Sequence, residues 1–290
     1  MERIASWHQT HWDWRAAGNF ILGGTGSGLA VSAALASLAG AAIPPLVFVV
    51  AALCVMSGLG LVWLEIGRPW RFLHVFFNPA TSWMTRESLI APWLLASLFS
   101  AAWWMQNPLT LLAGLFGAAF LYSQARVLTE SKGIPAWRER RILALVVTTG
   151  LAEGASVLLL FAAISGVSII TAAWLALGFV LLRGLAWARY RERFRRQPAP
   201  IGTREALERI GRPFLLVGTA APAAFAVLAI ALPGSASVTA PLAAVLAIGG
   251  GWALKHAIVT RAAFNQGFAV PHLPVYAKLR SARGSKPGWS

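Results

Sequence analysis

Eight stretches of about twenty mostly apolar residues constrain the fold of this 290-residue chain more than any other feature. A helix of that length crosses the hydrocarbon core of a bilayer, which is about 30 Å thick. None of the stretches alternates with the two-residue period of an outer-membrane strand, so the sequence predicts helices. We therefore expect an all-α, polytopic membrane protein with one transmembrane domain, flanked by an N-tail at 1–15 and a C-tail at 258–290. The eight expected spans are 16–38, 43–64, 88–105, 108–128, 141–163, 167–187, 212–232 and 238–257.

The composition supports this class and excludes several others. Hydrophobic residues make up 57% of the chain and charged residues 12%, whereas about 25% of a soluble domain is charged. So few charges exclude a typical cytosolic enzyme, a disordered chain and a nucleic-acid-binding domain with a solvated basic face. The single cysteine, Cys54, excludes an intrachain disulfide. It also excludes an iron–sulfur cluster or a cysteine-type zinc site held by this chain alone.

The placement of charge predicts how the chain crosses the bilayer. The connections at 106–107, 165–166 and 233–237 are short and uncharged, whereas the N-tail, 65–87, 129–140, 188–211 and 258–290 are long and basic. We expect all 25 Lys and Arg residues in these basic segments or at the helix ends beside them. With an even number of spans, the basic segments share one face. The positive-inside rule then predicts that both termini lie in the cytoplasm. The membrane we expect is a bacterial inner membrane. The N-tail has no small-residue cleavage pattern, so we expect the first helix to be retained.

Two further patterns suggest cofactors at first sight. The run Gly-Gly-Thr-Gly-Ser-Gly at 23–28 lacks the spacing of a dinucleotide-binding loop, because Leu29 occupies the place of the third glycine. It predicts close helix packing or room for a flat ligand. The five histidines provide no pair at a common depth inside the membrane, so we expect no haem in this chain.

Glu153 is the only acidic residue near the middle of an expected span. A carboxyl group at that depth is costly and is commonly functional. Two interpretations stay open. The residue is a protonated relay or hydrogen-bonds a neighbouring helix, or it is a neutral carboxyl satisfied by a serine or a backbone carbonyl.

The segment 65–87 carries the densest mixture of polar and aromatic residues. One interpretation is an amphipathic segment at the membrane interface, with snorkelling cations and a tryptophan belt. The other is a pocket for a quinone head, whose carbonyls need hydrogen-bond donors and whose reduction takes up two protons. The composition alone leaves the choice open. The ionisable residues of this segment are Glu65, Arg68, Arg71, His74, Arg86 and Glu87.

Several short motifs between residues 7 and 137 resemble those of one known family. The chain is similar to the membrane-anchor subunits of molybdopterin oxidoreductases, the NrfD, polysulfide reductase and dimethyl sulfoxide reductase anchor (DmsC-like) family. The motifs are Trp7-His8, Trp12-Asp-Trp14, Glu65-Ile-Gly-Arg-Pro-x-Arg, Asn78-Pro, Ser82-Trp-Met-Thr-Arg-Glu87, Tyr122-x-x-x-Arg126 and Ile134-Pro-Ala-Trp137.

The resemblance implies a non-catalytic anchor that exchanges electrons between the quinone pool and an iron–sulfur partner. The expected ligand is menaquinone or ubiquinone. The expected partners are a four-cluster (4Fe–4S) ferredoxin-like subunit, a molybdopterin subunit with molybdenum or tungsten, and the lipid bilayer, with no nucleic acid. The resemblance implies proton transfer by Glu87 and Glu65, and we expect no metal site. The alternatives are a secondary transporter and a purely structural tether. The residues expected around the ring are Asn19, Arg68, His74, Arg86, Tyr122 and Arg126.

Overall fold

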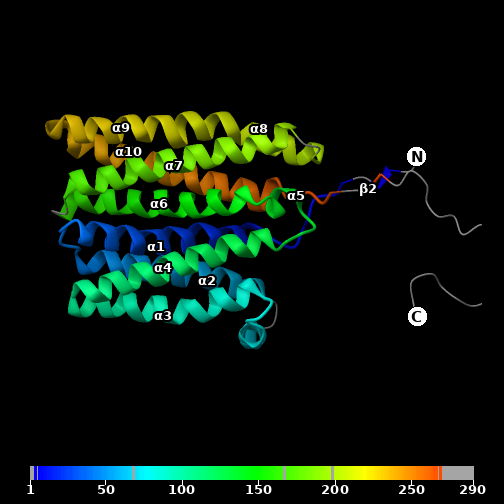
Figure 1. Ribbon diagram of the computed structural model, residues 1–290, viewed down its shortest axis with the longest axis horizontal. Helices are drawn as coiled ribbons and strands as arrows, with labels where there is room; N and C mark the ends of the chain where they lie inside the picture. Colours follow the sequence, from blue (N-terminus) through cyan, green and yellow to red (C-terminus); the bar gives the residue numbers. More distant parts are fainter. Residues whose placement is uncertain are drawn as a thin grey trace, which may run out of the picture.

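The computed structural model describes residues 3–4, 6–66, 69–165, 168–196, 199–266 and 268–269. Long helices running side by side make up most of it (Figure 1). A short antiparallel pairing joins β1 (Arg3–Ile4) to β2 (Phe268–Ala269). The helices are α1 (Trp14–Leu38), α2 (Pro45–Glu65), η1 (Pro69–Phe77), α3 (Trp83–Trp104), α4 (Asn107–Thr129), α5 (Pro135–Arg138), α6 (Arg141–Ser165), α7 (Ile169–Arg196), α8 (Ile201–Leu215), η2 (Leu216–Ala220), α9 (Ala221–Ala231), η3 (Pro233–Ser235), α10 (Ala236–His256) and η4 (Ala257–Arg261).

In the described residues, seven helical runs are long and apolar enough to cross a membrane. The expected all-α class is confirmed, and these runs indicate a multi-pass membrane protein. α3 covers the remaining expected span, but Arg86, Glu87 and four tryptophans leave it less apolar than the other seven. The seven are Trp14–Leu38, Pro45–Glu65, Asn107–Thr129, Arg141–Ser165, Ile169–Arg196, Ile201–Ala231 and Pro233–Arg261.

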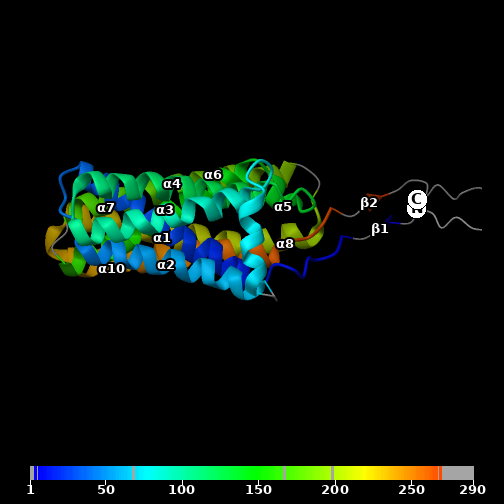
Figure 2. The ribbon, with the colours of Figure 1, turned by 90° about the horizontal axis from the view of Figure 1, so that it is seen from below.

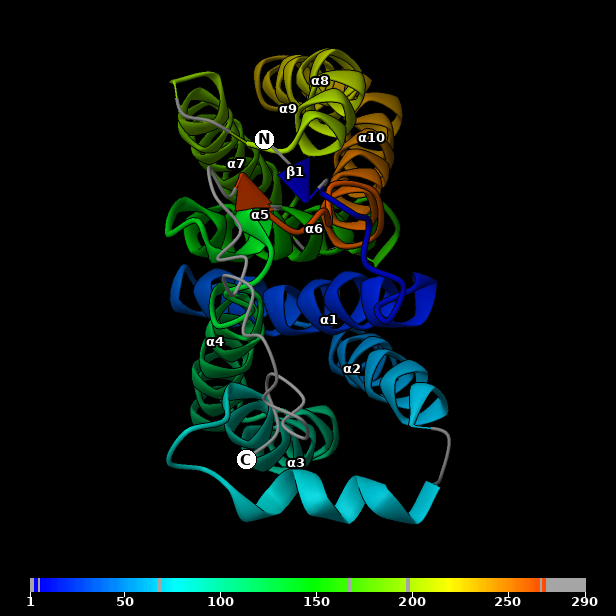
Figure 3. The ribbon, with the colours of Figure 1, turned by 90° about the vertical axis from the view of Figure 1, so that its right-hand side faces the viewer.

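α1 lies in the middle of the bundle. Seen end-on, α2, α3 and α4 lie on one side of it, and α6, α7, α8, α9 and α10 lie on the other (Figure 3). The glycine run of α1 makes the closest contact with the second group. A Cβ on Gly28 would overlap the backbone of Gly150, and a Cβ on Gly154 would overlap the backbone of Gly28. The close helix packing predicted from this run is therefore present where α1 meets α6.

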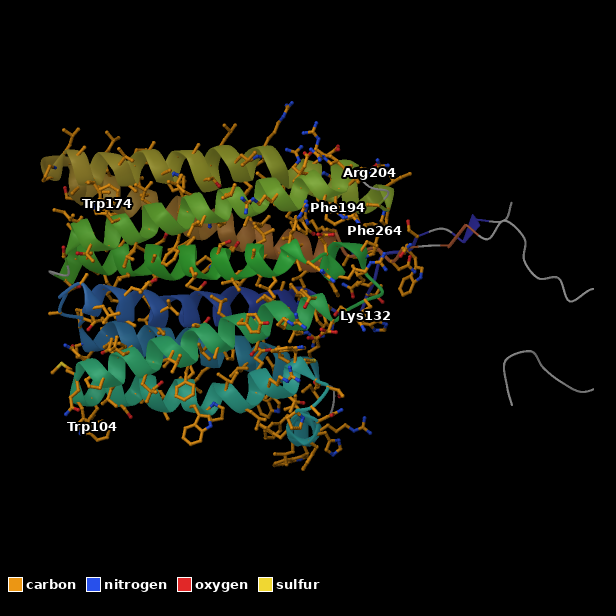
Figure 4. The ribbon with its side chains drawn as sticks, viewed as in Figure 1. Trp104, Lys132, Trp174, Phe194, Arg204 and Phe264 are labelled. Atoms are coloured by element: carbon orange, nitrogen blue, oxygen red, sulfur yellow. The ribbon has the colours of Figure 1, made fainter. Side chains whose placement is uncertain are left out.

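The two ends of the bundle differ in character. η1 crosses one end roughly perpendicular to the long helices, and α5, β1 and β2 lie at that same end (Figures 1 and 2). Lys132 and Arg204 also lie there, whereas Trp104 and Trp174 mark the opposite end (Figure 4). We call the end that carries η1 and α5 the basic end.

Helix boundaries at the basic end reflect local chemistry. α1 begins after Asp13, whose carboxylate caps the helix by accepting the backbone N–H of Arg15 at 2.7 Å. The Arg15 guanidinium also pairs with this carboxylate and holds the pKa of Asp13 below its ordinary value. α7 continues to Arg196 instead of ending at 187, and the run from α10 through η4 continues to Arg261. Cations that were expected at helix ends therefore lie inside helices.

Candidate functional site

A cavity of about 560 Å³ lies at the basic end, between α1, α2, η1 and α3. Its walls are mostly aliphatic and aromatic. Three of the predicted site residues, Asn19, Glu65 and Glu87, line it. The other lining residues are Trp12, Ala16, Phe20, Leu59, Gly60, Val62, Trp63, Ile66, Phe72, Val75, Phe76, Met84, Ser88, Ala91, Pro92, Leu95 and Val127.

Glu87 is the most deeply buried carboxyl group of this cavity, with 6% of its surface exposed. It lies in the first turn and a half of α3, after the Ser82 cap. The Asn19 amide donates to its Oε1 at 3.4 Å. Gln124 in turn donates to the backbone carbonyl of Asn19 at 3.0 Å. Among the described residues no cation pairs with Glu87. A carboxyl group held by an amide beside a cavity can accept and release a proton.

Glu65 is the last residue of α2 and reaches the same cavity from the other side. Arg15 of α1 lies close by, because its guanidinium donates to the carbonyl of Leu64 at 3.0 Å. Glu65 therefore lies near the charged surface of the basic end, whereas Glu87 lies deeper.

Arg86, Tyr122 and Arg126 gather around Trp83 instead of lining this cavity. The two guanidinium carbons lie 4.1 Å and 4.8 Å from the centre of the Trp83 ring, and the Tyr122 ring meets it edge-on at 5.6 Å. Arg86 donates to two backbone carbonyls of the preceding turn, and Arg126 pairs with Glu130 at 2.9 Å. The structure thus separates these three residues from Asn19, Glu65 and Glu87.

The last two predicted residues of this site lie elsewhere. His74 lies on η1, with its ring 6.3 Å from that of Phe77, and does not line the cavity. Arg68 lies outside the described residues.

Glu153 belongs to a different cluster in the middle of the bundle. Its side chain is fully buried, and its Oε2 accepts from Lys255 Nζ at 2.7 Å and from Thr25 Oγ1 at 2.8 Å. Arg183 is also fully buried and donates to the carbonyls of Ala247 and Gly218. The expectation that every Lys and Arg lies near a helix end is wrong for Arg183, which lies in the middle of α7. Lys255 lies in the last turn of α10, but its side chain is buried. Glu153 hydrogen-bonds the neighbouring helices α1 and α10, as the first interpretation expected, but neither interpretation included a cationic partner.

Sequence reasoning also missed Gln124, although it lies inside the motif Tyr122-x-x-x-Arg126. The available signal for Arg183 was its position, because it is separated by apolar residues from the charge run that starts at Arg189. For Lys255 the signal was a cation that ends a long uncharged run. Both positions resemble helix ends until the packing is known.

Within the described ranges, no group of three or more His, Cys, Asp or Glu side chains could hold a metal ion. Comparison with protein-family models and with curated proteins gives no match to this chain. The resemblance in the short motifs therefore stays a prediction.

Proposed function

We propose that this chain is the quinone-interacting membrane-anchor subunit of a molybdopterin oxidoreductase complex. The observation that carries the proposal is the cavity at the basic end, which combines aromatic and aliphatic walls with Asn19 and the buried carboxyl of Glu87. A quinone head needs such a combination, since its ring is apolar and its two carbonyls accept hydrogen bonds. The motif resemblance supplies the ligand class and the type of complex.

Each polar residue of the cavity has a role in this proposal. Asn19 holds the Glu87 carboxyl and carries an amide that can also face the ring. Glu87 gives or takes a proton as the ring is reduced or oxidised, because a two-electron quinone reduction consumes two protons. Glu65, nearer the surface, exchanges protons with water. The electrons pass between the ring and the four-cluster iron–sulfur partner, which connects to the molybdopterin subunit.

The proposal includes a topology. α3 serves as the eighth span, and both termini and the basic end face the cytoplasm. The charge run at the end of α7, from Arg189 to Arg196, supports this orientation by the positive-inside rule. The basic end then also provides the surface for the iron–sulfur partner, which keeps the cavity close to a cluster.

Filling the cavity tests the proposal directly. A Cβ on Gly60, which lines the cavity, would meet no atom within 4 Å, so Gly60→Leu places a side chain in open space. Gly249→Leu is the matched control, because a Cβ there also meets nothing and Gly249 does not line the cavity. The assay is quenching of tryptophan fluorescence by menadione or decylubiquinone in nanodiscs, since Trp12 and Trp63 border the cavity.

We expect saturable quenching in the wild type, at least about tenfold weaker binding in Gly60→Leu, and wild-type binding in Gly249→Leu. Equal binding in the wild type and Gly60→Leu would remove the cavity as the quinone site. In the assembled complex, Glu87→Gln should retain binding and lose most quinone-linked turnover. Glu130→Gln, a carboxyl change outside the cavity, should leave turnover intact.

A further inference from the structure

Three ionisable side chains from three helices meet in the middle of the bundle. Glu153 of α6 pairs with Lys255 of α10, and Arg183 of α7 approaches the same carboxylate. A Cβ on Gly251 would lie 2.5 Å from Glu153 Oε1 and 2.9 Å from Arg183 Nη1, so the absence of a side chain there lets the two groups converge. One carboxylate thus faces two cations. The cluster carries one excess positive charge in the bundle interior unless Lys255 gives up its proton.

This cluster is connected to the quinone cavity through the glycine pair of α1. Lys255 Nζ and Gln124 Oε1 both lie within 3.5 Å of the point where a Cβ on Gly24 would be. The amide nitrogen of Gln124 lies 2.5 Å from the corresponding point on Gly23. A side chain at Gly24 would displace the Lys255 ammonium, and one at Gly23 would displace the Gln124 amide. The glycines therefore let α4 on one side of α1 approach α10 on the other.

Three buried oxygen atoms without a hydrogen-bond donor lie between the quinone cavity and the ion pair. Asn19 Oδ1, Gln124 Oε1 and Glu153 Oε1 are buried and have no hydrogen-bond partner. Unpaired buried acceptors are rare in folded proteins and commonly belong to functional sites. Here they follow one another from the cavity, across α1, to the ion pair.

We propose that the Glu153–Lys255 pair exchanges one proton with Glu87 across α1. The O–H bond of Glu87 breaks and an N–H bond forms on Lys255, and the reverse step returns the proton, so that no electron moves. The negative charge left on Glu87 is balanced by the ammonium of Lys255. Gln124 is a positioning residue that holds Asn19, and Arg183 acts on Glu153 through its charge. The inference rests on the proposed function in one respect, which is that a quinone is the ligand that uses this proton.

A second cavity lies on the other side of the pair. Thr25, which donates to Glu153, accepts the indole N–H of Trp252 at 3.1 Å. Trp252 lines this cavity of about 800 Å³, which includes Arg209, His256 and Arg261. The indole only donates a hydrogen bond, so this contact fixes Thr25 beside Glu153 and does not itself carry a proton.

Two variants interrupt the route in different ways. Glu153→Gln/Lys255→Gln replaces the ion pair with two amides that can still hydrogen-bond. Gly24→Ala keeps every charged group but displaces the far end of the flexible Lys255 side chain. Gly18→Ala is the matched control, since its Cβ would displace only the far end of the Leu61 side chain. Circular dichroism and thermal melting establish that each variant is folded.

The first measurement follows the Glu87 carboxyl when decylubiquinone binds the full chain in nanodiscs. A decrease of its protonated C=O band in the infrared difference spectrum reports the proton that passes to the pair. We expect this decrease in the wild type and Gly18→Ala, and a loss of most of it in the other two variants, with binding retained. Binding without a change of this band in the wild type, or an unchanged decrease in both interrupted variants, would overturn the inference.

The second measurement needs no quinone and separates this inference from the proposed function. The infrared C=O band of Glu87, identified by its loss in Glu87→Gln, is titrated with pH. The charged or titratable groups around the pair are the Arg183 guanidinium and, more distantly, the Cys54 thiol, and both remain in every variant. If Glu87 and the pair share a proton, the midpoint of this band shifts by about one pH unit in both interrupted variants. An unshifted midpoint overturns the inference even where quinone binds, and a shift supports it even where quinone does not.

Discussion

The charge count of the buried cluster predicts an unequal cost for removing its two main members. Glu153→Gln leaves Lys255 and Arg183 facing each other without a counter-charge, whereas Lys255→Gln leaves the Glu153 carboxylate beside Arg183. Both members of the ion pair are buried, and 2.7 Å separates their charged atoms. Breaking such a pair so that a charge stays unpaired costs about 3–5 kcal/mol. Losing only one hydrogen bond costs about 1–2 kcal/mol.

We therefore expect Glu153→Gln to lower the free energy of unfolding by about 3–5 kcal/mol and Lys255→Gln by about 1–2 kcal/mol. The double variant restores the excess charge of the wild type, so it should be more stable than Glu153→Gln alone. The assay is reversible unfolding in mixed micelles of mild detergent and dodecyl sulfate, monitored by tryptophan fluorescence. Glu192→Gln is the control, because its partner Arg196 has 77% of its side chain exposed, and its midpoint should not move.

Two results would refute this reasoning. If Lys255→Gln destabilised the protein as much as Glu153→Gln, Arg183 would not act as a second counter-charge. If the double variant were less stable than Glu153→Gln alone, the two side chains would contribute independently instead of as a pair.

Three other predictions concern packing, capping and sidedness. Gly154→Ala should lower the free energy of unfolding by about 1–3 kcal/mol or more, because its Cβ would overlap the α1 backbone. Gly178→Ala should leave the stability unchanged, because a Cβ there faces open space, and the unfolding midpoints of the two variants test this difference. Asp13→Ala should cost about 1 kcal/mol by uncapping α1. The pKa of Asp13 is lowered in the folded protein, so its contribution to stability is present above the ordinary pKa of 3.8 and is lost as the pH falls below that value. The destabilisation by Asp13→Ala should therefore vanish when unfolding is measured at acid pH. Green fluorescent protein fused after Ser290 should be fluorescent, and alkaline phosphatase there should be inactive.

Apolar length was sufficient to predict where the long helices lie, since each of the eight expected ranges overlaps a long helix and seven of these qualify as spans. The ends were harder to predict, because a helix can continue after its apolar part stops. α7 continues through a run of Arg and Glu, which are good helix formers, and Glu192 and Arg196 pair one turn apart. The spans read from hydropathy therefore ended too early on the basic side, and Arg183 was taken for a residue near a helix end.

The position of a residue along its apolar segment decided whether its role could be predicted. Asn19, Glu65 and Glu87 are polar residues at the starts and ends of apolar segments, where their chemistry is visible along the chain. The Glu153–Lys255 pair joins residues 102 positions apart, and it forms only because Gly24 and Gly251 leave room beside α1 and α10. A buried carboxyl considered alone suggests a neutral group, since an unpaired charge at that depth is too costly. Because two cations lie at the same depth as the carboxylate, their attraction offsets part of the free-energy cost of burying its charge. The glycines, which the sequence assigned to packing alone, also let these side chains meet across α1.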